Sequence, residues 1–372
     1  MENKFNNGEL GIIFLDNFKK RGTEVCEHIM KARNMSDISQ LIIPAKSPRF
    51  SNGEGKVILD ESVRDKDIYI ISDISNYSCT YQMYGHKNLM GPDEHYQDIL
   101  RTISAIAGKA KRLTVFMPLL YSSRQHRRTA RESLDCALAL RQLESLGVNT
   151  IVTLDAHDPN IQNATPNGSF ETIFPTYPIL KTFIETEGKN INKENMIVIS
   201  PDTGAMERSI KYASMLGLDV GLFYKRRDYS RIVNGKNPII QHDYVGSDIT
   251  GKDVLIIDDM IASGGSVIDI CEQLKKRNAR NIYVITTFAF FTEGLSAFDK
   301  LYEEGKLKAV YSTNASYIGE NLKNAKWFHE VNVCELIAQI IDVLNTGKSM
   351  GYLIDSSEIV KNLLEPESTS KQ

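Results

Sequence analysis

Several features that would narrow the class of this protein are missing from its 372-residue sequence. It has only five cysteines, and no two of them form a C-x-x-C pair, so the sequence indicates neither a disulfide scaffold nor a paired-cysteine zinc site. No apolar run approaches the roughly 18 residues that a membrane-spanning helix needs. The opening residues, MENKFNNGEL, lack the basic and then apolar pattern of a signal peptide. These absences predict a cytoplasmic protein without a membrane partner.

A strong excess of one charge is also missing. The chain has 44 Lys and Arg residues against 47 Asp and Glu residues, and the resulting net charge of −3 argues against bulk nucleic-acid binding. Hydrophobic residues make up 42% of the chain, which is enough for a packed core and excludes a mainly disordered protein. At roughly 150 residues per domain, the length favours two domains.

What the sequence does contain is a regular alternation of short apolar runs with amphipathic segments. The runs are rich in Ile and Val, as expected for strands covered on both faces: 67–74, 113–120, 150–154, 196–199, 220–224, 254–257 and 281–288. Between them, apolar residues recur on one helical face, as Ile99, Ile103 and Ile106 do. This alternation predicts an α/β fold with mainly parallel sheets flanked by helices.

A stretch that contains Asn, Pro, Gly and Ser, residues 163–173, separates two such series and is the expected domain boundary. We therefore expect one domain over residues 1–165 and a second over residues 166–325. A helix within 326–355 is expected to pack back on the first domain. The polar residues 356–372 are expected to form a frayed tail.

The strongest chemical signal is the segment DVLIIDDMIASGGSVI at residues 253–268. An apolar strand is expected to end at Asp258 and Asp259, and a loop of small residues then opens a helix: Ala262, Ser263, Gly264, Gly265 and Ser266. Glycines let a backbone approach an anion, and the free N–H groups of a helix start favour a phosphate. The two carboxylates suit vicinal hydroxyls, held directly or through water on a metal ion. An ordinary turn with two solvated aspartates is the alternative.

Two short basic clusters also follow predicted strands. In the first, Arg124 offers a planar fork for phosphate oxygens, and Gln125 can hydrogen-bond a nucleotide. The second is Lys225-Arg226-Arg227, and the polar stretch 228–245 after it reads as a long mobile loop of the kind that often forms a lid. The alternatives are a solvated turn or a patch for single-stranded nucleic acid for the first cluster, and a solvated strand end for the second.

A histidine flanked by acids closes another predicted strand. His157 follows Asp155 by two residues and directly precedes Asp158. A lone histidine is more often structural than functional, but acids on both sides suit an imidazole that is oriented on a metal ion. This segment therefore indicates a candidate metal ligand.

Taken together, these segments resemble the ribose-phosphate diphosphokinases. The segment 253–268 resembles the phosphoribosyl-diphosphate loop, which this family shares with type I phosphoribosyltransferases. Five other segments match the diphosphokinases in the expected order, within a resemblance that covers roughly residues 40–355: 49–54, 121–128, 153–158, 200–204 and 225–227. The resemblance implies two phosphoribosyltransferase-like domains, of which the first leans toward ATP and the second holds the sugar phosphate.

The resemblance also implies a role for individual residues. The residues expected to bind ATP are Phe50, Asn52, Glu54, Arg124 and Gln125. Ribose 5-phosphate is expected to contact Asp258 and Asp259 through its hydroxyls, and the small-residue loop Ala262, Ser263, Gly264, Gly265 and Ser266 through its phosphate. Mg²⁺, or Mn²⁺ in its place, is expected at His157 and at Asp202, which is otherwise a simple helix cap. Catalysis is expected to rest on Lys225 and Arg227.

The implied enzyme transfers the diphosphate group of ATP to the C1 hydroxyl of ribose 5-phosphate, forming 5-phosphoribosyl 1-diphosphate and AMP for nucleotide biosynthesis. Members of the family assemble as homo-oligomers, built from dimers and reaching hexamers. Two alternatives stay open: a phosphoribosyltransferase that uses the diphosphorylated sugar, and a catalytically weak regulatory subunit. Ala262 stands where many diphosphokinases have an acid, and residues 126–131 lack the family's acid-and-lysine pattern, which keeps the second alternative open.

Overall fold

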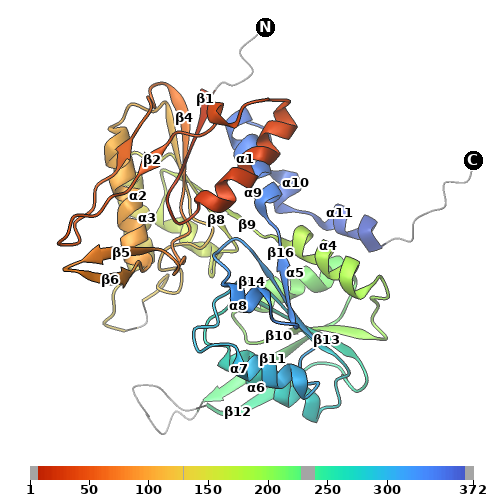
Figure 1. Ribbon diagram of the computed structural model, residues 1–372. Coiled ribbons are helices and arrows are strands. Elements are labelled where there is room, and N and C mark those ends of the chain that lie inside the picture. Colours follow the sequence, from red (N-terminus) through yellow and green to blue (C-terminus); the bar gives the residue numbers. More distant parts are fainter. Residues whose placement is uncertain (1–6, 129, 228–238, 365–372) are drawn as a thin grey trace, which may run out of the picture. The chain divides into compact units, whose positions relative to one another are not determined.

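The computed structural model describes residues 7–128, 130–227 and 239–364, with the backbone alone at 225–227 and 239–242. The chain divides into two compact units. Unit 1 comprises Met1–Pro175, Ala315–Tyr317 and Asn332–Ile354, and unit 2 comprises Thr176–Asn314, Ile318–Val331 and Asp355–Gln372. The C-terminal part of the chain therefore contributes to both units, as the blue helices of Figure 1 illustrate.

Unit 1 is built on a five-stranded parallel sheet in the order β1-β4-β7-β8-β9. Its strands are β1 (Glu9–Phe14), β4 (Lys66–Ile71), β7 (Arg112–Phe116), β8 (Thr150–Leu154) and β9 (Ser169–Ile173). Ile68, Ile70, Val115 and Val152 are fully buried, as expected for β-branched residues of a parallel sheet that is covered on both faces.

The other elements of unit 1 surround this sheet. They are α1 (Lys19–Arg33), η1 (Ile38–Gln40), β2 (Ala45–Lys46), β3 (Ile58–Leu59), β5 (Thr80–Met83), β6 (His86–Leu89), α2 (Pro92–Ile106), α3 (Asp135–Ser145), η2 (Pro159–Ala164), α9 (Cys334–Thr346) and α10 (Gly351–Ile354). Helix α2 begins at Pro92, whose fixed φ suits a first turn, and the Glu94 side chain accepts a hydrogen bond from Gly91 N at 2.9 Å. Helix α9 packs against α1, and Figure 1 shows the two side by side.

Unit 2 is built on a seven-stranded sheet in the order β12-β11-β10-β13-β14-β15-β16. Its strands are β10 (Met196–Ser200), β11 (Val220–Arg227), β12 (Ile239–Val245), β13 (Asp253–Ile261), β14 (Ile282–Ala289), β15 (Ala309–Thr313) and β16 (Phe328–Val331). All neighbours pair in parallel except β11 and β12, which are antiparallel.

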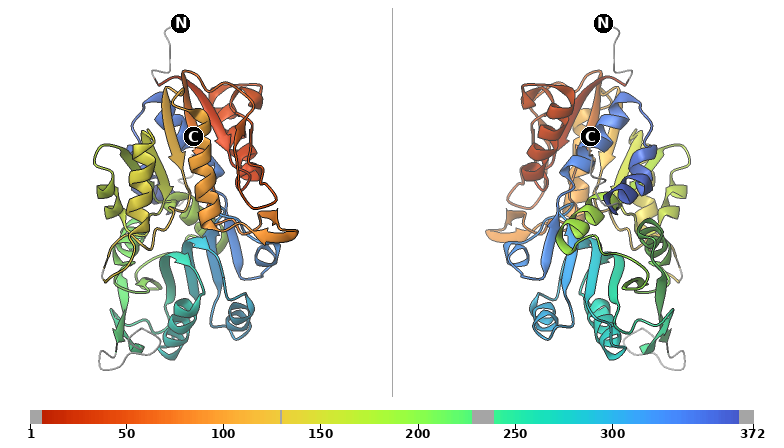
Figure 2. Two further views of the ribbon diagram at one scale, coloured as in Figure 1. Left: turned by 90° about the vertical axis from the view of Figure 1, so that its left-hand side faces the viewer. Right: turned by 90° about the vertical axis from the view of Figure 1, so that its right-hand side faces the viewer.

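Helices cover both faces of the unit 2 sheet, as the two views of Figure 2 show. They are α4 (Thr176–Glu187), α5 (Met206–Leu216), α6 (Gly265–Lys276), α7 (Ser296–Glu303), α8 (Glu320–Lys323) and α11 (Ser357–Leu364). One core joins the sheet to α6 and α7 through Ile270 and Phe298. The other core joins it to α4, α5 and α11 and includes Phe183 and Val360.

This architecture confirms the predicted α/β fold with mainly parallel sheets. Every strand expected from the sequence is present, with ends shifted by a few residues. Besides the end of β13, described below, two expectations differ from the structure. Part of the stretch 228–245, expected to be a loop, is strand β12, because its residues pair with β11; residues 228–238 lie outside the described residues. Part of the expected polar tail is helix α11, because Val360 is fully buried in the core of unit 2.

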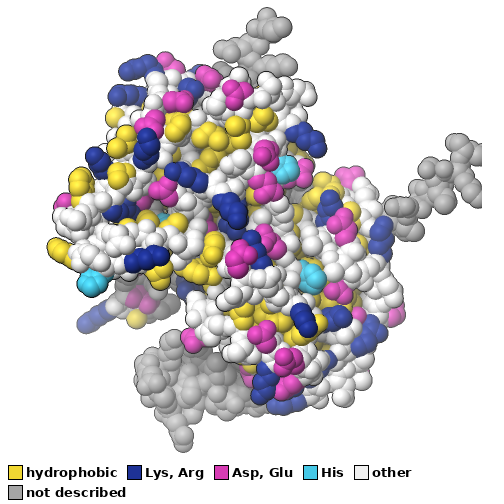
Figure 3. Space-filling model, viewed as in Figure 1, with side chains coloured by type: hydrophobic (Ala, Val, Ile, Leu, Met, Phe, Trp, Pro, Cys, Tyr) yellow, Lys and Arg dark blue, Asp and Glu magenta, His cyan; other side chains and the backbone are white. Residues whose placement is uncertain are grey.

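The distribution of charged side chains on the surface agrees with the nearly balanced charge of the sequence. On the face drawn in Figure 3, Lys and Arg side chains alternate with Asp and Glu side chains and do not gather in one basic area. Within the described part of the chain, no helix combines the length and the apolar character that crossing a bilayer requires.

Candidate active site

The residues predicted to bind the sugar phosphate lie toward the end of β13 in unit 2. The sequence predicted that this strand ends at Asp258 and Asp259, but it continues to Ile261 because Met260 and Ile261 pair with Phe288 and Ala289 of β14. Asp258 and Asp259 therefore lie within the strand rather than at its end. Asp259 is only 4% exposed, and its N–H donates a hydrogen bond of 2.9 Å to Asp258 Oδ1.

The small-residue loop then enters helix α6 through a left-handed glycine. Gly264 has a φ of 86°, and a Cβ there would lie 2.5 Å from Cε2 of Phe298, so only glycine fits this position. Ser263, Gly265 and Ser266 around it are exposed. A 12-residue helix therefore begins in an exposed loop a few residues after two carboxylates, and a helix start of this kind suits a phosphorylated sugar.

Charged neighbours shape the electrostatics around Asp258. Burial and the adjacent Asp259 raise the pKa of Asp258 well above its usual value, and Asp202 raises it further. The guanidinium of Arg208 acts in the opposite direction and lowers that pKa. Arg208 is a buried residue of helix α5 that the sequence analysis missed, because no local pattern links it to a strand so distant along the chain.

The sequence left two roles open for Asp202, a helix cap and a metal ligand, and the structure bears on the first. Its Oδ1 accepts hydrogen bonds from Gly204 N at 2.9 Å and Ala205 N at 3.2 Å, so it does order the loop that leads into α5. Its electrostatic effect on Asp258 also brings it near the residues predicted to bind the sugar phosphate. Its role as a metal ligand stays a prediction.

The residues predicted to bind ATP lie in unit 1 and start with the loop that carries Phe50, Asn52 and Glu54. The loop closes on itself through a hydrogen bond of 2.7 Å from Phe50 N to Glu54 O. Phe50 is 51% exposed. Arg49 anchors the loop on helix α2, since its Nη2 lies 2.6 Å from Oδ2 of Asp98 and both side chains are nearly buried.

The second predicted nucleotide segment is anchored on the same helix. The Tyr121 hydroxyl donates a hydrogen bond of 2.7 Å to Asp93 Oδ1, and its ring stacks on Tyr96 at 4.2 Å between centroids. Arg124 and Gln125 follow and are exposed. Both predicted ATP-binding segments therefore contact helix α2, one through Asp98 and the other through Asp93. Spacing along the sequence did not reveal this shared anchor.

His157 stands out from the end of β8 on a strained backbone. Asp155, two residues earlier, is buried and has a φ of 47°, a left-handed conformation that is uncommon for residues other than glycine. His157 itself is exposed, and its ring centroid lies 5.4 Å from that of His126. His126 Nε2 in turn lies 3.3 Å from Asp158 Oδ2, so the first basic segment lies beside the candidate metal ligand.

The donor atoms near these residues suit a magnesium ion that has few protein ligands. Among the described residues, no group of three or more His, Cys, Asp or Glu side chains is arranged to hold a metal. Mg²⁺ keeps several waters and is commonly held by one or two side chains together with substrate phosphates. Asp202 offers the carboxylate oxygen that Mg²⁺ prefers, whereas His157 offers a ring nitrogen, and the role of both residues as ligands stays a prediction.

The predicted catalytic residues, Lys225 and Arg227, are the sixth and eighth residues of strand β11. Lys225 pairs with His242 of β12, and Arg227 pairs with Ile239 after a bulge. Their side chains, and residues 228–238 of the stretch 228–245 that was expected to form a lid, lie outside the described residues. The catalytic role of both residues stays a prediction.

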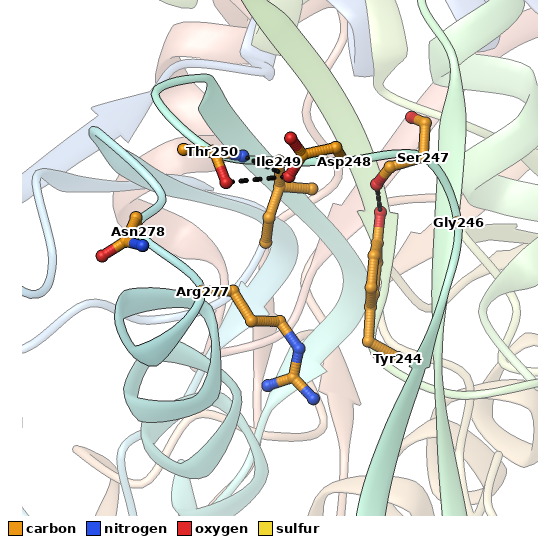
Figure 4. A pocket seen from close by; sticks show the side chains of 8 residues that line it. All are labelled: Tyr244, Gly246, Ser247, Asp248, Ile249, Thr250, Arg277 and Asn278. Atoms are coloured by element: carbon orange, nitrogen blue, oxygen red, sulfur yellow. Dashed lines mark hydrogen bonds between the residues drawn. The ribbon is translucent and has the colours of Figure 1, made fainter.

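A separate cavity of about 370 Å³ opens in unit 2 and contains no predicted site residue. Figure 4 shows Tyr244 of β12 on one side of the cavity and Arg277, which follows α6, on the other, with Asp248 and Thr250 above Arg277. These residues precede β13 and β14 or follow α6, so the cavity lies at the amino ends of the parallel strands. Ligands of such sheets bind at the carboxyl ends, and we do not assign the cavity to the active site.

Comparison with known proteins matches both halves of the chain. The family model of the N-terminal domain of ribose phosphate pyrophosphokinase matches residues 4–147, and that of the phosphoribosyl transferase domain matches residues 176–308. The ribose-phosphate pyrophosphokinase of Corynebacterium ammoniagenes is 26% identical over 360 residues, covering 95% of this chain and 100% of that relative. The corresponding protein of Mycoplasma genitalium is 26% identical over 318 residues, covering 85% of this chain and 86% of its own length.

A solved structure agrees with these matches at the level of the fold. The crystal structure of phosphoribosylpyrophosphate synthetase from Mycobacterium smegmatis has a TM-score of 0.72 with 22% identity, over 90% of this chain and 98% of that chain. Two family models in the expected order, relatives matched over nearly their whole length and a common fold lead to one conclusion. The chain belongs to the ribose phosphate pyrophosphokinase family.

Proposed function

We infer that this chain is an enzyme that transfers the diphosphate group of ATP to the C1 hydroxyl of ribose 5-phosphate. The products are 5-phosphoribosyl 1-diphosphate and AMP. Membership of the family supports the reaction. The observation that supports it is the start of helix α6, where the exposed residues Ser263, Gly265 and Ser266 follow the strand that contains Asp258 and Asp259.

The chemistry requires positioning and charge neutralisation more than it requires a reactive side chain. The oxygen of the C1 hydroxyl attacks the β-phosphorus of ATP and loses its proton to solvent. The bond from the β-phosphorus to the oxygen that bridges to the α-phosphate breaks, and AMP leaves with that oxygen. No covalent bond to the protein is needed, so preorganised charges account for most of the rate enhancement.

The residues divide between the two substrates. Asp258 and Asp259 accept hydrogen bonds from the ribose hydroxyls, and the loop at Gly264 holds the 5-phosphate through its backbone N–H groups. Arg124 and Gln125 bind the phosphates and the nucleoside of ATP, and Phe50 stacks on its base.

Cations balance the charge that develops on the phosphates. Lys225 and Arg227 stabilise the negative charge of the transferring diphosphate and exclude water from it. His157 and Asp202 are the residues that would hold Mg²⁺ or Mn²⁺, and the bound ion supplies neutralisation of phosphate charge. We expect the protein to act as a homo-oligomer built from dimers, which sedimentation analysis would establish.

The decisive experiment measures AMP release from ATP, ribose 5-phosphate and Mg²⁺ by the purified protein. We expect AMP and 5-phosphoribosyl 1-diphosphate to form together and only when the sugar is present. The Lys225→Ala variant should lose about 10²- to 10³-fold in kcat with a smaller change in the KM for the sugar. Lys326→Ala, an exposed lysine outside the site, serves as the matched control.

Two results would redirect the assignment. Absence of AMP with the well-folded wild type would favour a regulatory subunit. Full turnover by Lys225→Ala would remove this lysine from the catalytic machinery while leaving the reaction itself in place.

A further inference from the structure

A two-stranded hairpin in unit 1, formed by β5 and β6, lies against the predicted ATP-binding loop. Tyr84 N at its turn donates a hydrogen bond of 2.8 Å to Ser51 O. The guanidinium of Arg49 lies 5.8 Å from the centroid of the Tyr81 ring. Gly53 has a φ of 94°, and a side chain there would approach Sδ of Met83 to 2.7 Å. The loop is therefore shaped around the turn end of the hairpin.

Tyr84, the first residue of the turn, has a backbone conformation that is unfavourable for a bulky side chain. Tyr84 and Gly85 connect the strands with φ values of 49° and 78°, so both residues are left-handed, as in a type I′ turn. Such turns prefer Asn-Gly, and a bulky residue at the first position is strained. A turn that needed only to connect two strands would not require tyrosine here.

Packing does not explain the tyrosine either. Its side chain is 76% exposed, which is the highest value among the large hydrophobic residues that the structure describes. Its backbone contacts Ser51, the residue after Phe50, whose ring is also more than half exposed. Two contacting segments thus each present an aromatic ring to solvent. Exposed aromatic rings are the usual surface on which nucleic-acid bases stack.

We propose that the turn end of the β5–β6 hairpin is a base-recognition element, in which Tyr84 offers the purine a second aromatic surface beside Phe50. Tyr81 and Met83 hold the loop 49–55 in the conformation that presents Phe50. The ligand is the purine of a nucleoside triphosphate, so this inference rests on the proposed function for the identity of the nucleotide as ATP.

The experiment separates the ring from the turn. Tyr84→Asn removes the ring and installs the residue that the turn prefers, Tyr84→Phe keeps the ring, and Leu89→Ala removes an exposed apolar side chain at the end of the hairpin away from the turn. Calorimetry measures binding of ATP and CTP analogues with a methylene group between the α- and β-phosphates, since this is the bond that the reaction breaks. Thermal unfolding of each variant is measured in parallel.

We expect Tyr84→Asn to bind the ATP analogue about tenfold more weakly than the wild type does. The ratio of its affinities for the ATP and CTP analogues should be smaller, and its Tm should be unchanged or higher. Tyr84→Phe and Leu89→Ala should bind as the wild type does. Wild-type affinity in Tyr84→Asn would overturn the inference, as would a lowered Tm that accompanies the weaker binding. A changed oligomer size with unchanged binding would instead assign the ring to a contact between copies of the chain.

The same experiment distinguishes this inference from the proposed function. A wild type that binds the ATP analogue but releases no AMP in the assay with ribose 5-phosphate would contradict the proposed reaction and leave base recognition by Tyr84 standing. A wild type that binds neither analogue would overturn both.

Discussion

Positive φ angles occur close to candidate site residues in each unit. Asp155 lies two residues before the exposed His157 in unit 1, and Gly264 directly precedes helix α6 in unit 2. The left-handed conformation of Gly264 lies so close to Phe298 that a side chain would not fit. Backbone strain of this kind persists only where the surrounding structure enforces it.

Gly264→Ala should destabilise unit 2 by about 1–3 kcal/mol, because the new Cβ clashes with Phe298 and the residue keeps a positive φ. Urea unfolding followed by the fluorescence of the single tryptophan, Trp327, measures this change, since Trp327 is buried in unit 2. Gly265→Ala is the matched control for stability, because its new Cβ would meet only Ser263 Oγ, at 4.0 Å. Equal stability of the two variants would contradict the packing argument.

A half-buried histidine should make unit 2 sensitive to acid. Burial lowers the pKa of His329, which stacks on Tyr311 at 4.6 Å, while Glu187 acts in the opposite direction. A lowered pKa in the folded state means that the stability contribution is complete above the unfolded value, near 6.5, and is lost as the pH falls through the folded value. The Trp327 unfolding midpoint should therefore fall more between pH 8 and pH 5 in the wild type than in His329→Gln. Parallel curves for the two proteins would exclude this role.

At the scale of elements, a buried polar cluster joins two strands and two helices of unit 1. Asp67 on β4 is fully buried and accepts two hydrogen bonds of 2.8 Å from Arg112 on β7. Asn345 on α9 donates a third, of 2.9 Å, to the same carboxylate. Arg33 on α1 binds both Asn345 and Asp342 of α9. The cluster therefore attaches a helix from the end of the chain to a sheet from its beginning.

Arg112→Met should lower the stability of unit 1 by about 3 kcal/mol, because it leaves the Asp67 carboxylate buried without its counter-charge. The double variant Asp67→Asn/Arg112→Met should lose less than the sum of the two single variants. Urea unfolding followed by far-UV circular dichroism measures all four proteins, since Trp327 lies in the other unit. Strict additivity would show that the two groups do not stabilise one another.

Most strands could be predicted from the sequence, whereas strand β12 and helix α11 could not. Apolar runs such as 196–199 predict strands because both faces are covered, so local composition reflects burial. Edge strand β12 escaped prediction because a polar, Gly- and Pro-containing stretch leads into it, and its pairing with β11 is set by the fold. Helix α11 escaped as part of a polar tail, although Val360, Leu363 and Leu364 have the spacing of a helical face.

The candidate site divides in the same way. Sequence motifs point to Asp258, Gly264 and His157 because strand ends and glycine loops leave local patterns. They do not point to Arg208 or to the anchoring of two nucleotide segments on α2, because those relations join residues far apart in the chain. The side chains of Lys225 and Arg227 lie outside the described residues, so their part rests on the resemblance alone.

At the scale of the whole molecule, the two units are interleaved along the chain. Unit 1 requires Asn332–Ile354 in addition to its N-terminal residues, while α11 returns to unit 2. Helix α9 buries Ile337, Ile340 and Ile341 and supplies Asn345 to the buried cluster. Neither unit is therefore a continuous segment that could be excised intact.

Removal of residues 332–372 should leave unit 1 poorly folded, because the surface that α1 presents to α9 loses its cover. The control lacks only residues 355–372, which deprives unit 2 of α11 but leaves α9 in place. Hydrogen exchange of peptides from β4 and β7, measured on both truncated proteins, should show loss of protection only in the longer deletion. Full protection in both would mean that unit 1 does not depend on α9.

The return of α9 has a consequence for how the protein is made. Domains generally fold on the ribosome in the order of their synthesis, starting with the N-terminal one. Here the sheet of unit 1 is synthesised early, but the helix that completes it arrives after nearly all of unit 2 has been translated. During that interval the nascent chain must leave the α9-facing side of α1 and the buried Asp67 incompletely covered. The late helix therefore makes unit 1 the part of the chain that depends longest on protection from chaperones.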